Sequence, residues 1–412
     1  MSTIVSIGGS DSNDIFAQYP MLTDAFGRVR TAQPLTLFDS SHRYRDNGLW
    51  NTSTTSGGTA VFSPNEGLMN LNVTSTAGSE VIRETTKVFS YQPGKSLLVT
   101  NTFVMAPAQT NLRQRVGYFG TENGIYIQLR DNTLSFVGRS LVTGVVTESV
   151  VNQASWNADT MDGNGPSGVT LDITKAQILF MDIEWLGEGT VRIGFIIDGN
   201  FIVCHRFNHA NLIASTYITT ASLPLRCEIL NASTATATTL KQVCSSVISE
   251  GGYELRGAQQ AVGTPITAPK NLAVAGTFYP IVSIKLSAGY QDAIVILTAL
   301  SIMGVATGIY NWKVVATGTT TGGAWVSAGV NSSVEYNITG TSFAGGRTLT
   351  SGFITSTAQA SANLDILKEA LFSFQLERNS FTSTSYELSL IVAASTNSEL
   401  IYSSMDWEEV SR

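Results

Sequence analysis

The feature that most constrains this chain is an alternation of apolar and polar residues over short stretches. It is clearest in residues 178–186 and 191–197, where every second residue is apolar. A period of two is typical of a β-strand, because neighbouring side chains point to opposite faces of the sheet. The apolar residues that share a face are Leu179, Met181, Ile183 and Trp185 in the first run, and Val191, Ile193, Phe195 and Ile197 in the second. The chain is therefore expected to form sheets with one buried face each.

These two runs predict an antiparallel hairpin that closes through residues 187–189 (Gly-Glu-Gly). A three-residue loop with Gly189 in the left-handed conformation fits this sequence. It would pair apolar with apolar and acid with base: Trp185 with Val191, Ile183 with Ile193, and Glu184 with Arg192. This register is supported because it pairs like with like on the apolar face of the hairpin and opposite charges on the polar face. A third strand, residues 201–207, is expected after a turn at residues 198–200.

Similar patterns predict strand after strand from about residue 36 to residue 255. The strongest local signal is Asn123-Gly124 between two apolar runs in residues 116–130, which is typical of a hairpin. Further strands are expected at residues 96–105 and 133–137, and turns or loops at residues 131–132, 156–168 and 232–239.

The length of 412 residues exceeds what one core usually serves, so more than one domain is expected. Residues 1–35 lack a sustained period and are expected to form an extended arm. Residues 36–262 should form a first β-domain, and the two prolines and polar residues of 263–271 suggest a linker. Residues 272–412 should form a second, smaller sandwich or jelly roll.

Six strands are expected in this second domain: residues 279–286, 293–303, 310–317, 333–339, 385–393 and 400–407. Residues 363–376 differ, because Leu364, Leu367 and Leu371 have helical spacing. A short helix that leads into a strand is compatible with this segment.

Charged residues make up 13% of the chain, about half the usual share, and hydrophobic residues make up 43%. That balance excludes wholesale disorder, which requires many charges and few apolar residues. The net charge of −7 argues against a protein that binds nucleic-acid phosphates with a basic face. The small basic clusters Arg28/Arg30, Arg43/Arg45 and Arg113/Arg115 are expected on strand faces or at subunit contacts.

The three cysteines, Cys204, Cys227 and Cys244, are an odd number without metal-ligand spacing, so free thiols from a reducing cytoplasm are expected. The first residues, MSTIVSIGGSDSND, have no basic start and no long apolar stretch, so no signal peptide is predicted. The longest apolar run, residues 293–305, is too short to span a bilayer. We therefore expect assembly in a cytoplasm and release by a route such as lysis.

The three histidines are His42, His205 and His209. His205 and His209 are four residues apart and Cys204 precedes them, but no Glu follows His205 as in zinc proteases. A zinc site needs three or four convergent ligands, so hydrogen-bonded structural roles are expected instead.

A second candidate is the loop that contains Asp159, Asp162 and Asn164. Their oxygens could bind Ca²⁺, which prefers such ligands in a flexible loop. Their spacing does not match the helix-loop-helix pattern, however, and a polar loop explains them equally well. No metal is therefore predicted.

Asp182 and Glu184 share one strand face, about 7 Å apart from the rise of a strand. That separation is near the range of glycosidase carboxylates. The predicted pairing of Glu184 with Arg192 would, however, keep Glu184 ionised and unfit as a general acid. No nucleophile elbow, phosphate-binding loop or dinucleotide fingerprint is present. The six tryptophans, Trp50, Trp156, Trp185, Trp312, Trp325 and Trp407, are expected in cores rather than in a sugar-stacking platform.

Five motifs carry a resemblance. Residues 23–40 read TDAFGRVRTAQPLTLFDS, and YQPGKS (91–96), DGNGPSG (162–168), DIEWLG (182–187) and VRIGFIIDG (191–199) follow in order. This series, over roughly residues 20–230, resembles a group of virion-associated proteins of tailed bacteriophages. Residues 191–203 also look like the central hairpin of concanavalin-like jelly rolls, a class that often binds glycans. The resemblance implies a jelly roll in residues 36–262, virion assembly and no catalytic activity.

We therefore expect a non-enzymatic structural subunit on the exterior of a bacteriophage virion: a head decoration, a head fibre or a tail accessory protein. Its expected partners are other virion proteins and copies of itself, without cofactor, metal, nucleic acid or membrane insertion. One alternative is a receptor-binding tail protein whose jelly roll binds a surface glycan. Another is a polysaccharide-degrading enzyme that uses Asp182 and Glu184.

Overall fold

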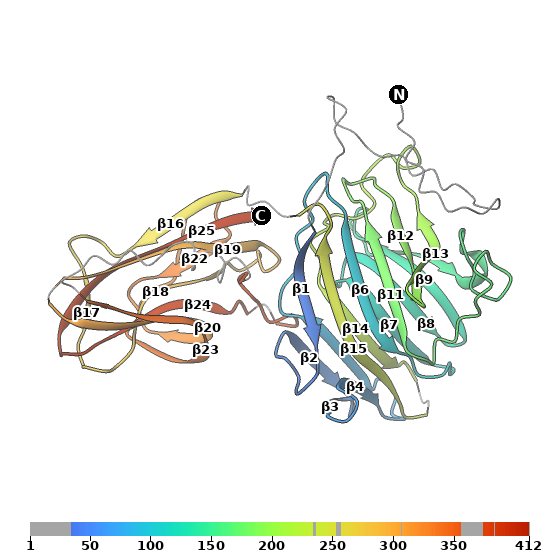
Figure 1. Ribbon diagram of the computed structural model, residues 1–412, viewed down its shortest axis with the longest axis horizontal. Helices are drawn as coiled ribbons and strands as arrows, with labels where there is room; N and C mark the ends of the chain where they lie inside the picture. The colour runs from blue at the N-terminus through green and yellow to red at the C-terminus, as the bar shows by residue number, and fades with distance from the viewer. Residues whose placement is uncertain are drawn as a thin grey trace, which may run out of the picture.

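The computed structural model describes residues 34–233, 236–252, 257–305, 307–355, 374–382 and 384–411. These residues form two β-sandwiches that lie side by side (Figure 1), with one short 3-10 turn at Gln153–Ser155. The predicted class, an all-β chain with a jelly-roll sandwich and then a smaller sandwich, is confirmed. Residues 1–33 of the predicted arm lie outside the described residues. Within the described ranges, no helix has the length and apolar character needed to cross a membrane.

The first sheet of the N-terminal sandwich has eight strands in the order β13-β12-β11-β6-β15-β4-β3, with β1 paired to β15. The long strand β15 pairs with β4 near its start and with β1 near its end, while β6 lies on its other side. The strands are β1 (Leu35–Ser41), β3 (Thr59–Ser63), β4 (Leu68–Val73), β6 (Leu97–Val104), β11 (Gln177–Ile183), β12 (Val191–Ile197), β13 (Asn200–Phe207) and β15 (Thr238–Ser249).

The second sheet of this sandwich has seven strands in the order β10-β9-β8-β7-β14-β5-β2. The predicted hairpin around Asn123-Gly124 is its β7–β8 pair, but the loop comprises residues 120–123 and Gly124 already pairs with Phe119. Only glycine fits there, because a Cβ on Gly124 would lie 2.2 Å from the Cβ of Phe119. The strands are β2 (Trp50–Thr55), β5 (Glu80–Thr85), β7 (Leu112–Phe119), β8 (Gly124–Arg130), β9 (Thr133–Ser140), β10 (Thr147–Asn152) and β14 (Leu225–Asn231).

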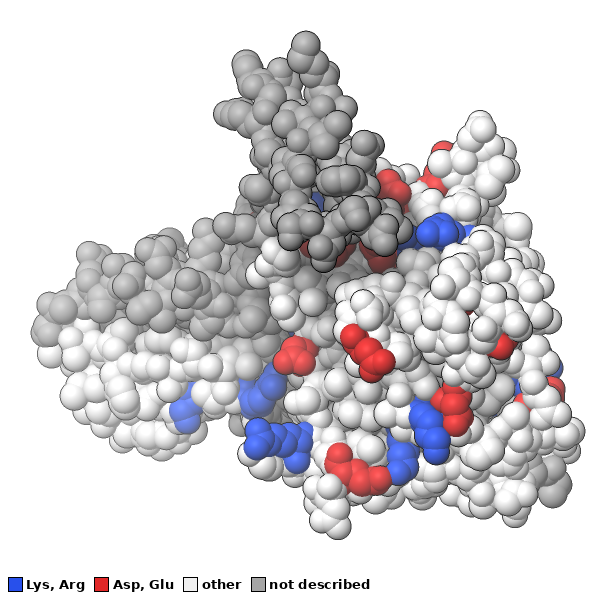
Figure 2. Space-filling model, turned by 45° about the vertical axis from the view of Figure 1, so that its right-hand side comes forward, with Lys and Arg blue, Asp and Glu red and all other residues white. Residues whose placement is uncertain are grey.

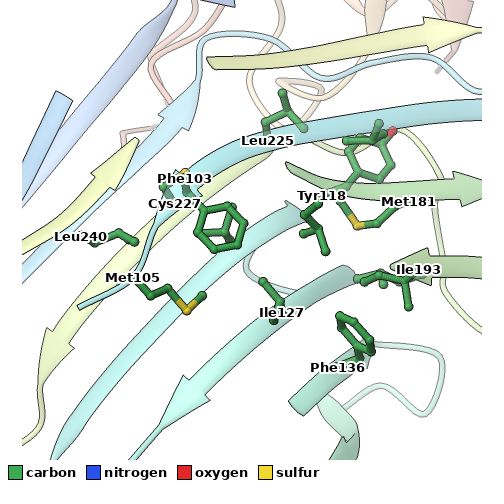
Figure 3. Packing of buried hydrophobic residues seen from close by; sticks show 14 of the residues in the cluster. Phe103, Met105, Tyr118, Ile127, Phe136, Met181, Ile193, Leu225, Cys227 and Leu240 are labelled. Atoms are coloured by element: carbon green, nitrogen blue, oxygen red, sulfur yellow. The ribbon is translucent and has the colours of Figure 1, made fainter. Parts of the chain in front are cut away.

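The core of the N-terminal sandwich lies between these two sheets (Figure 3). The alternating residues that the sequence placed on one face of β11 and β12 are buried in it, except Ile197 at the end of β12 and Trp185 after β11, which are half-buried and pack at its margin. From the opposite sheet, Phe136 stacks on Trp156 with 4.1 Å between ring centroids. Each fully buried large apolar side chain contributes about 1.5–3 kcal/mol, so alternation alone explains why these strands close into a sandwich.

The C-terminal sandwich packs a four-stranded sheet against a six-stranded sheet. In the first, β25 (Glu399–Ser411) pairs with β16 (Ala258–Gly263), β17 (Lys270–Leu272) and β19 (Ile294–Gly304). The second has the order β21-β22-β18-β24-β20-β23. Its strands are β18 (Tyr279–Leu286), β20 (Ile309–Thr321), β21 (Val326–Ser327), β22 (Val334–Asn337), β23 (Ser342–Thr355) and β24 (Glu387–Ala394).

The boundary between the domains lies before the predicted linker at 263–271. Strand β16 already pairs with β25, from Ala258 opposite Glu409 to Gly263 opposite Ser404. The chain therefore enters the C-terminal sandwich by residue 258, inside the range 36–262 assigned to the first domain. The prolines of 263–271 mark only the connection from β16 to β17, because a proline pair signals a break in a strand without showing which sheet follows.

The six strands expected in the C-terminal domain are present, with bounds that differ by a few residues. Four further strands, β16, β17, β21 and β23, were not predicted. Strand β23 contains five glycines or serines and is mostly exposed, so it lacks the alternation that marks a half-buried strand. Most of the helical segment expected at residues 363–376 lies outside the described residues; Phe374 and Leu376 are buried in the core.

The two sandwiches are joined at the β2–β5 edge of the seven-stranded sheet. Glu84 of β5 lies 3.0 Å from Arg226 of its own domain and 3.3 Å from Arg378 of the other. Arg378 also contacts Asp292 at 2.8 Å, and its backbone N–H donates to the carbonyl of Thr86. Beside this joint, Val88 packs with Ile294 and Ile296 in a small buried cluster. Polar and apolar contacts therefore hold the domains together.

Candidate functional site

A groove of about 480 Å³ opens at one end of the eight-stranded sheet. Three segments form it: residues 91–96 before β6, residues 182–192 at the β11–β12 connection, and residues 206–208 at the end of β13. Each segment contributes polar side chains to the groove. They lie at or beyond the ends of the strands, where the pattern of alternating buried residues stops. The groove collects both candidate carboxylates, Asp182 and Glu184.

In the β11–β12 hairpin beside the groove, each side chain lies on the predicted face of the sheet, but the two strands pair in a different register. Ile183 pairs with Val191 and Asp182 pairs with Arg192, so the predicted pairing of Glu184 with Arg192 is wrong by two residues. Residues 184–190 form a wide loop in place of the expected three-residue turn. A shift of two keeps every side chain on its face, which is why the alternation could not distinguish the two registers.

The loop conformation explains the shift. The left-handed residues are Leu186 (φ 39°) and Gly187 (φ 85°), not Gly189 as predicted. Gly189 is required for space, since a Cβ there would lie 1.9 Å from the carbonyl oxygen of Glu184. The backbone N–H of Gly189 donates to the carbonyl of Trp185 at 2.6 Å, which closes the loop.

Asp182 is the central acid of the groove and is hydrogen-bonded to Arg192. Burial raises the pKa of Asp182; Arg192 opposes this, while Glu250 and Glu184 add to it. Glu184 lies beyond the end of β11 and is exposed. The two acids are thus in different environments, and within the described residues only Asp182 forms an ion pair.

The other charges of the groove are cationic. Arg206 lies directly opposite Arg192 in the β12–β13 pair, and its side chain is exposed. Lys95 comes from the neighbouring segment and donates to Gln92 at 3.1 Å. The lining therefore has three cations, Lys95, Arg192 and Arg206, against two carboxylates.

Aromatic side chains line the groove or pack beside it. Tyr91 lines it and meets Trp185 edge to face, with 5.9 Å between ring centroids. His209 stacks on Tyr217 at 3.9 Å, and its Nδ1 lies 2.7 Å from the carbonyl oxygen of Gly189. His209 therefore stabilises the loop, in the structural role that was expected.

The remaining candidate metal ligands do not converge. His205 Nδ1 accepts from the backbone N–H of Asn157 at 3.3 Å, and His42 is buried at another place in the sandwich. Burial lowers the pKa of His42 to about 4, with Arg83 adding to the effect and Asp46 opposing it. In the described part of the chain, no three His, Cys, Asp or Glu side chains group as metal ligands.

The candidate calcium loop is held together by its own carboxylates. Asp159 accepts from the backbone N–H groups of Met161 at 2.8 Å and Ser167 at 2.7 Å. Asp162 accepts from the backbone of Asn164 at 2.9 Å and from Thr160. These carboxylate oxygens accept hydrogen bonds from within the loop, which supports the interpretation of residues 156–168 as a polar loop.

Four of the six tryptophans are buried in the cores, as the sequence predicted: Trp50, Trp156, Trp312 and Trp407. Trp185 and Trp325 are half-buried, and Lys285 Nζ lies 4.2 Å from the centre of the Trp325 ring. Cys204 and Cys227 are buried and Cys244 is half-buried, and all three are free thiols. Arg43 and Arg45 are exposed in a loop, whereas Arg28 and Arg30 lie outside the described residues.

The outer face of the seven-stranded sheet carries a buried charge network that sequence reasoning missed. Glu228 contacts Arg113 at 2.5 Å, Arg226 at 3.1 Å and Arg115 at 3.5 Å. Burial alone would raise the pKa of Glu228, but these arginines outweigh it and hold the pKa below its ordinary value. Arg113/Arg115 thus lie on a strand face, and Glu228 on the neighbouring strand was the signal that could have identified their partner.

Charged side chains cover little of the face shown in Figure 2. There, Lys, Arg, Asp and Glu form small groups, several of both signs, between wide uncharged areas. This agrees with the 13% of charged residues in the sequence.

No family model matches this chain, and no curated protein matches it in sequence. Among solved structures it is similar to the carbohydrate recognition domain of Emp47p, at 12% identity over 55% of this chain and 99% of that domain, with a TM-score of 0.33. A glycoside hydrolase family 16 endo-glucanase from Bacteroides ovatus matches at 8% identity over 51% of this chain and 99% of that chain, with a TM-score of 0.35. The CBM2 module of the evolved Dit of Lactobacillus casei BL23 phage J-1 matches at 7% identity over 55% of this chain and 100% of the module, with a TM-score of 0.32. At these values the likeness carries no argument about what this chain does.

Proposed function

We propose that this chain is a structural component of the exterior of a bacteriophage virion, such as a head decoration, head fibre or tail accessory protein. It acts by binding other virion proteins and copies of itself, and it is assembled in the cytoplasm of the host. The ordered motifs between residues 23 and 199, which resemble virion-associated proteins of tailed phages, support this proposal. No catalytic role is proposed for any residue.

The structural observation that carries the proposal is the outer edge of the six-stranded sheet, beyond which no other described strand pairs. Strand β23 is the last strand of that sheet, is 14 residues long and is mostly exposed. Arg347 is its one charged residue and it has no proline, although proteins usually protect such edges with charges or prolines. Phe353 of β23 is 70% exposed and Ile309 of β20, on the same face, is 53% exposed. An exposed edge with apolar side chains is typical of an assembly surface.

The test is Phe353→Asp in the full chain. If β23 is an assembly surface, a charge at its largest exposed side chain should weaken self-association about tenfold or more, because hot-spot aromatics dominate such interfaces. Sedimentation equilibrium of the purified chain measures this, and Leu212→Asp, at a loop residue that is 72% exposed, is the matched control. Equal association of the Phe353→Asp variant and the wild type would refute the role of this edge.

A second candidate function is glycan recognition by a tail protein, which the polar groove beside Tyr91 favours. Sugars bind through planar polar side chains and aromatic rings, and both kinds of group line the groove. A glycan array with the purified chain separates the two functions, because a chain that acts only in assembly should bind no glycan.

A further inference from the structure

We propose that the groove binds an acidic glycan, and that Arg192 and Arg206 contact the carboxylate or sulfate group of the sugar. This inference rests on the second candidate function, glycan recognition, and names the class of sugar. It is independent of the proposed role of strand β23 in assembly.

The groove is less acidic than the chain as a whole, which has a net charge of −7. Its lining has three cations and two carboxylates, and a third carboxylate, Glu250, lies close to Asp182 and accepts a hydrogen bond from Ser96. Arg192 is matched by Asp182, but among the described residues no carboxylate contacts the guanidinium of Arg206. A planar guanidinium with free N–H donors suits a carboxylate or sulfate group, which accepts two parallel hydrogen bonds.

Arg192 and Arg206 are cross-strand neighbours. They are directly opposite each other in the β12–β13 pair, so their side chains lie on the same face. Like charges at such positions destabilise a sheet. An anion that binds between them would remove this repulsion, so the arrangement favours a negatively charged ligand over a neutral one.

The rest of the lining suits a sugar better than a simple anion. Asn208 and Thr190, hydrogen-bonded to each other at 3.3 Å, offer donors and acceptors for sugar hydroxyls, and the oxygen of Ser96, which donates to Glu250, can still accept. Tyr91 provides an aromatic surface. The volume of about 480 Å³ lies within the range of small-molecule sites, about 300–1,000 Å³, and exceeds what inorganic phosphate requires.

The experiment measures binding of three probes to the full chain by isothermal titration calorimetry: trigalacturonate, neutral maltotriose and inorganic phosphate. We expect trigalacturonate to bind and the other two to bind at least about tenfold more weakly. Arg206→Gln should weaken trigalacturonate binding about tenfold or more while the melting temperature stays the same or rises, since the repulsion with Arg192 is removed.

The matched control is Arg130→Gln, because Arg130 also lies opposite an arginine, Arg113, but outside the groove. It should leave binding unchanged. Unchanged affinity in the Arg206→Gln variant, or stronger binding of maltotriose, would overturn the acidic-glycan inference and leave glycan recognition standing. Equal binding of phosphate would also overturn it, and an array without any bound glycan would remove the second candidate function itself.

Discussion

Asp159 is a residue whose role depends on its backbone partners rather than on a ligand. Its carboxylate is buried in the loop of residues 156–168 and accepts two backbone hydrogen bonds, from Met161 and Ser167. Burial raises its pKa, but these hydrogen bonds outweigh burial and hold the pKa below the ordinary value of 3.8. The sequence predicted the loop, but it could not show which oxygens the backbone uses, because that depends on the path of the loop.

Asp159→Asn should destabilise the chain by about 1–3 kcal/mol at neutral pH, because one acceptor becomes a donor that faces a backbone N–H. A depressed pKa contributes stability that is present above the ordinary value and is lost as the pH falls through the folded-state value. The difference between wild type and variant should therefore shrink below about pH 3.8. Urea unfolding at several pH values measures it, with the exposed Asp39→Asn as control. A difference that is independent of pH would contradict this role.

At the scale of elements, alternation predicted the strands and their faces well, but not their partners. The runs around residues 178–186 and 191–197 do form neighbouring strands, yet the register differs by two residues. The loop length is set by steric crowding at Gly189 and by the left-handed backbone of Leu186 and Gly187. The alternation of apolar and polar residues contains no information about either. Strand β23 was missed for the opposite reason, since it is exposed on most of its length and has no buried face to create a pattern.

Gly189→Ala tests this account of the hairpin. The added Cβ would clash with the backbone of Glu184, so we expect a loss of about 1–3 kcal/mol in the free energy of unfolding. Gly144→Ala is the control, because Gly144 has a φ of 78° and open space around it, and should cost only about 1 kcal/mol of backbone strain. Thermal unfolding compares the two. A smaller loss at Gly189 than at Gly144 would show that the loop adapts and that crowding does not set the register.

At the scale of the molecule, the joint between the sandwiches depends on residues far apart in the sequence. Arg378 is 294 positions from Glu84 in the sequence, and both side chains are more than nine-tenths buried. No local pattern predicts such a pair. The same limit explains the misplaced domain boundary, since the membership of β16 follows from its pairing with β25 at the far end of the chain.

Arg378→Ala should uncouple the two sandwiches. Glu84 keeps Arg226 as a partner after this change, so the loss of the charged contacts of Arg378 should cost about 1.5–3 kcal/mol. Differential scanning calorimetry should show one unfolding transition for the wild type and two for the variant, because each sandwich has its own core. Arg130→Gln, at an exposed position, should behave as the wild type. A single unshifted transition in the Arg378→Ala variant would mean that the apolar contacts and the remaining hydrogen bonds between the domains suffice to couple them.

The central claim is that this chain joins a virion through protein contacts. The most direct measurement is quantitative mass spectrometry, with cryo-electron microscopy, of particles purified with the full chain and with a chain that lacks residues 1–35. We predict that the full chain is present on the particle exterior at a fixed copy number, and that the shortened chain folds but is absent. Particles that lack the full chain would contradict the claim, and normal incorporation of the shortened chain would show that residues 1–35 are not needed for it.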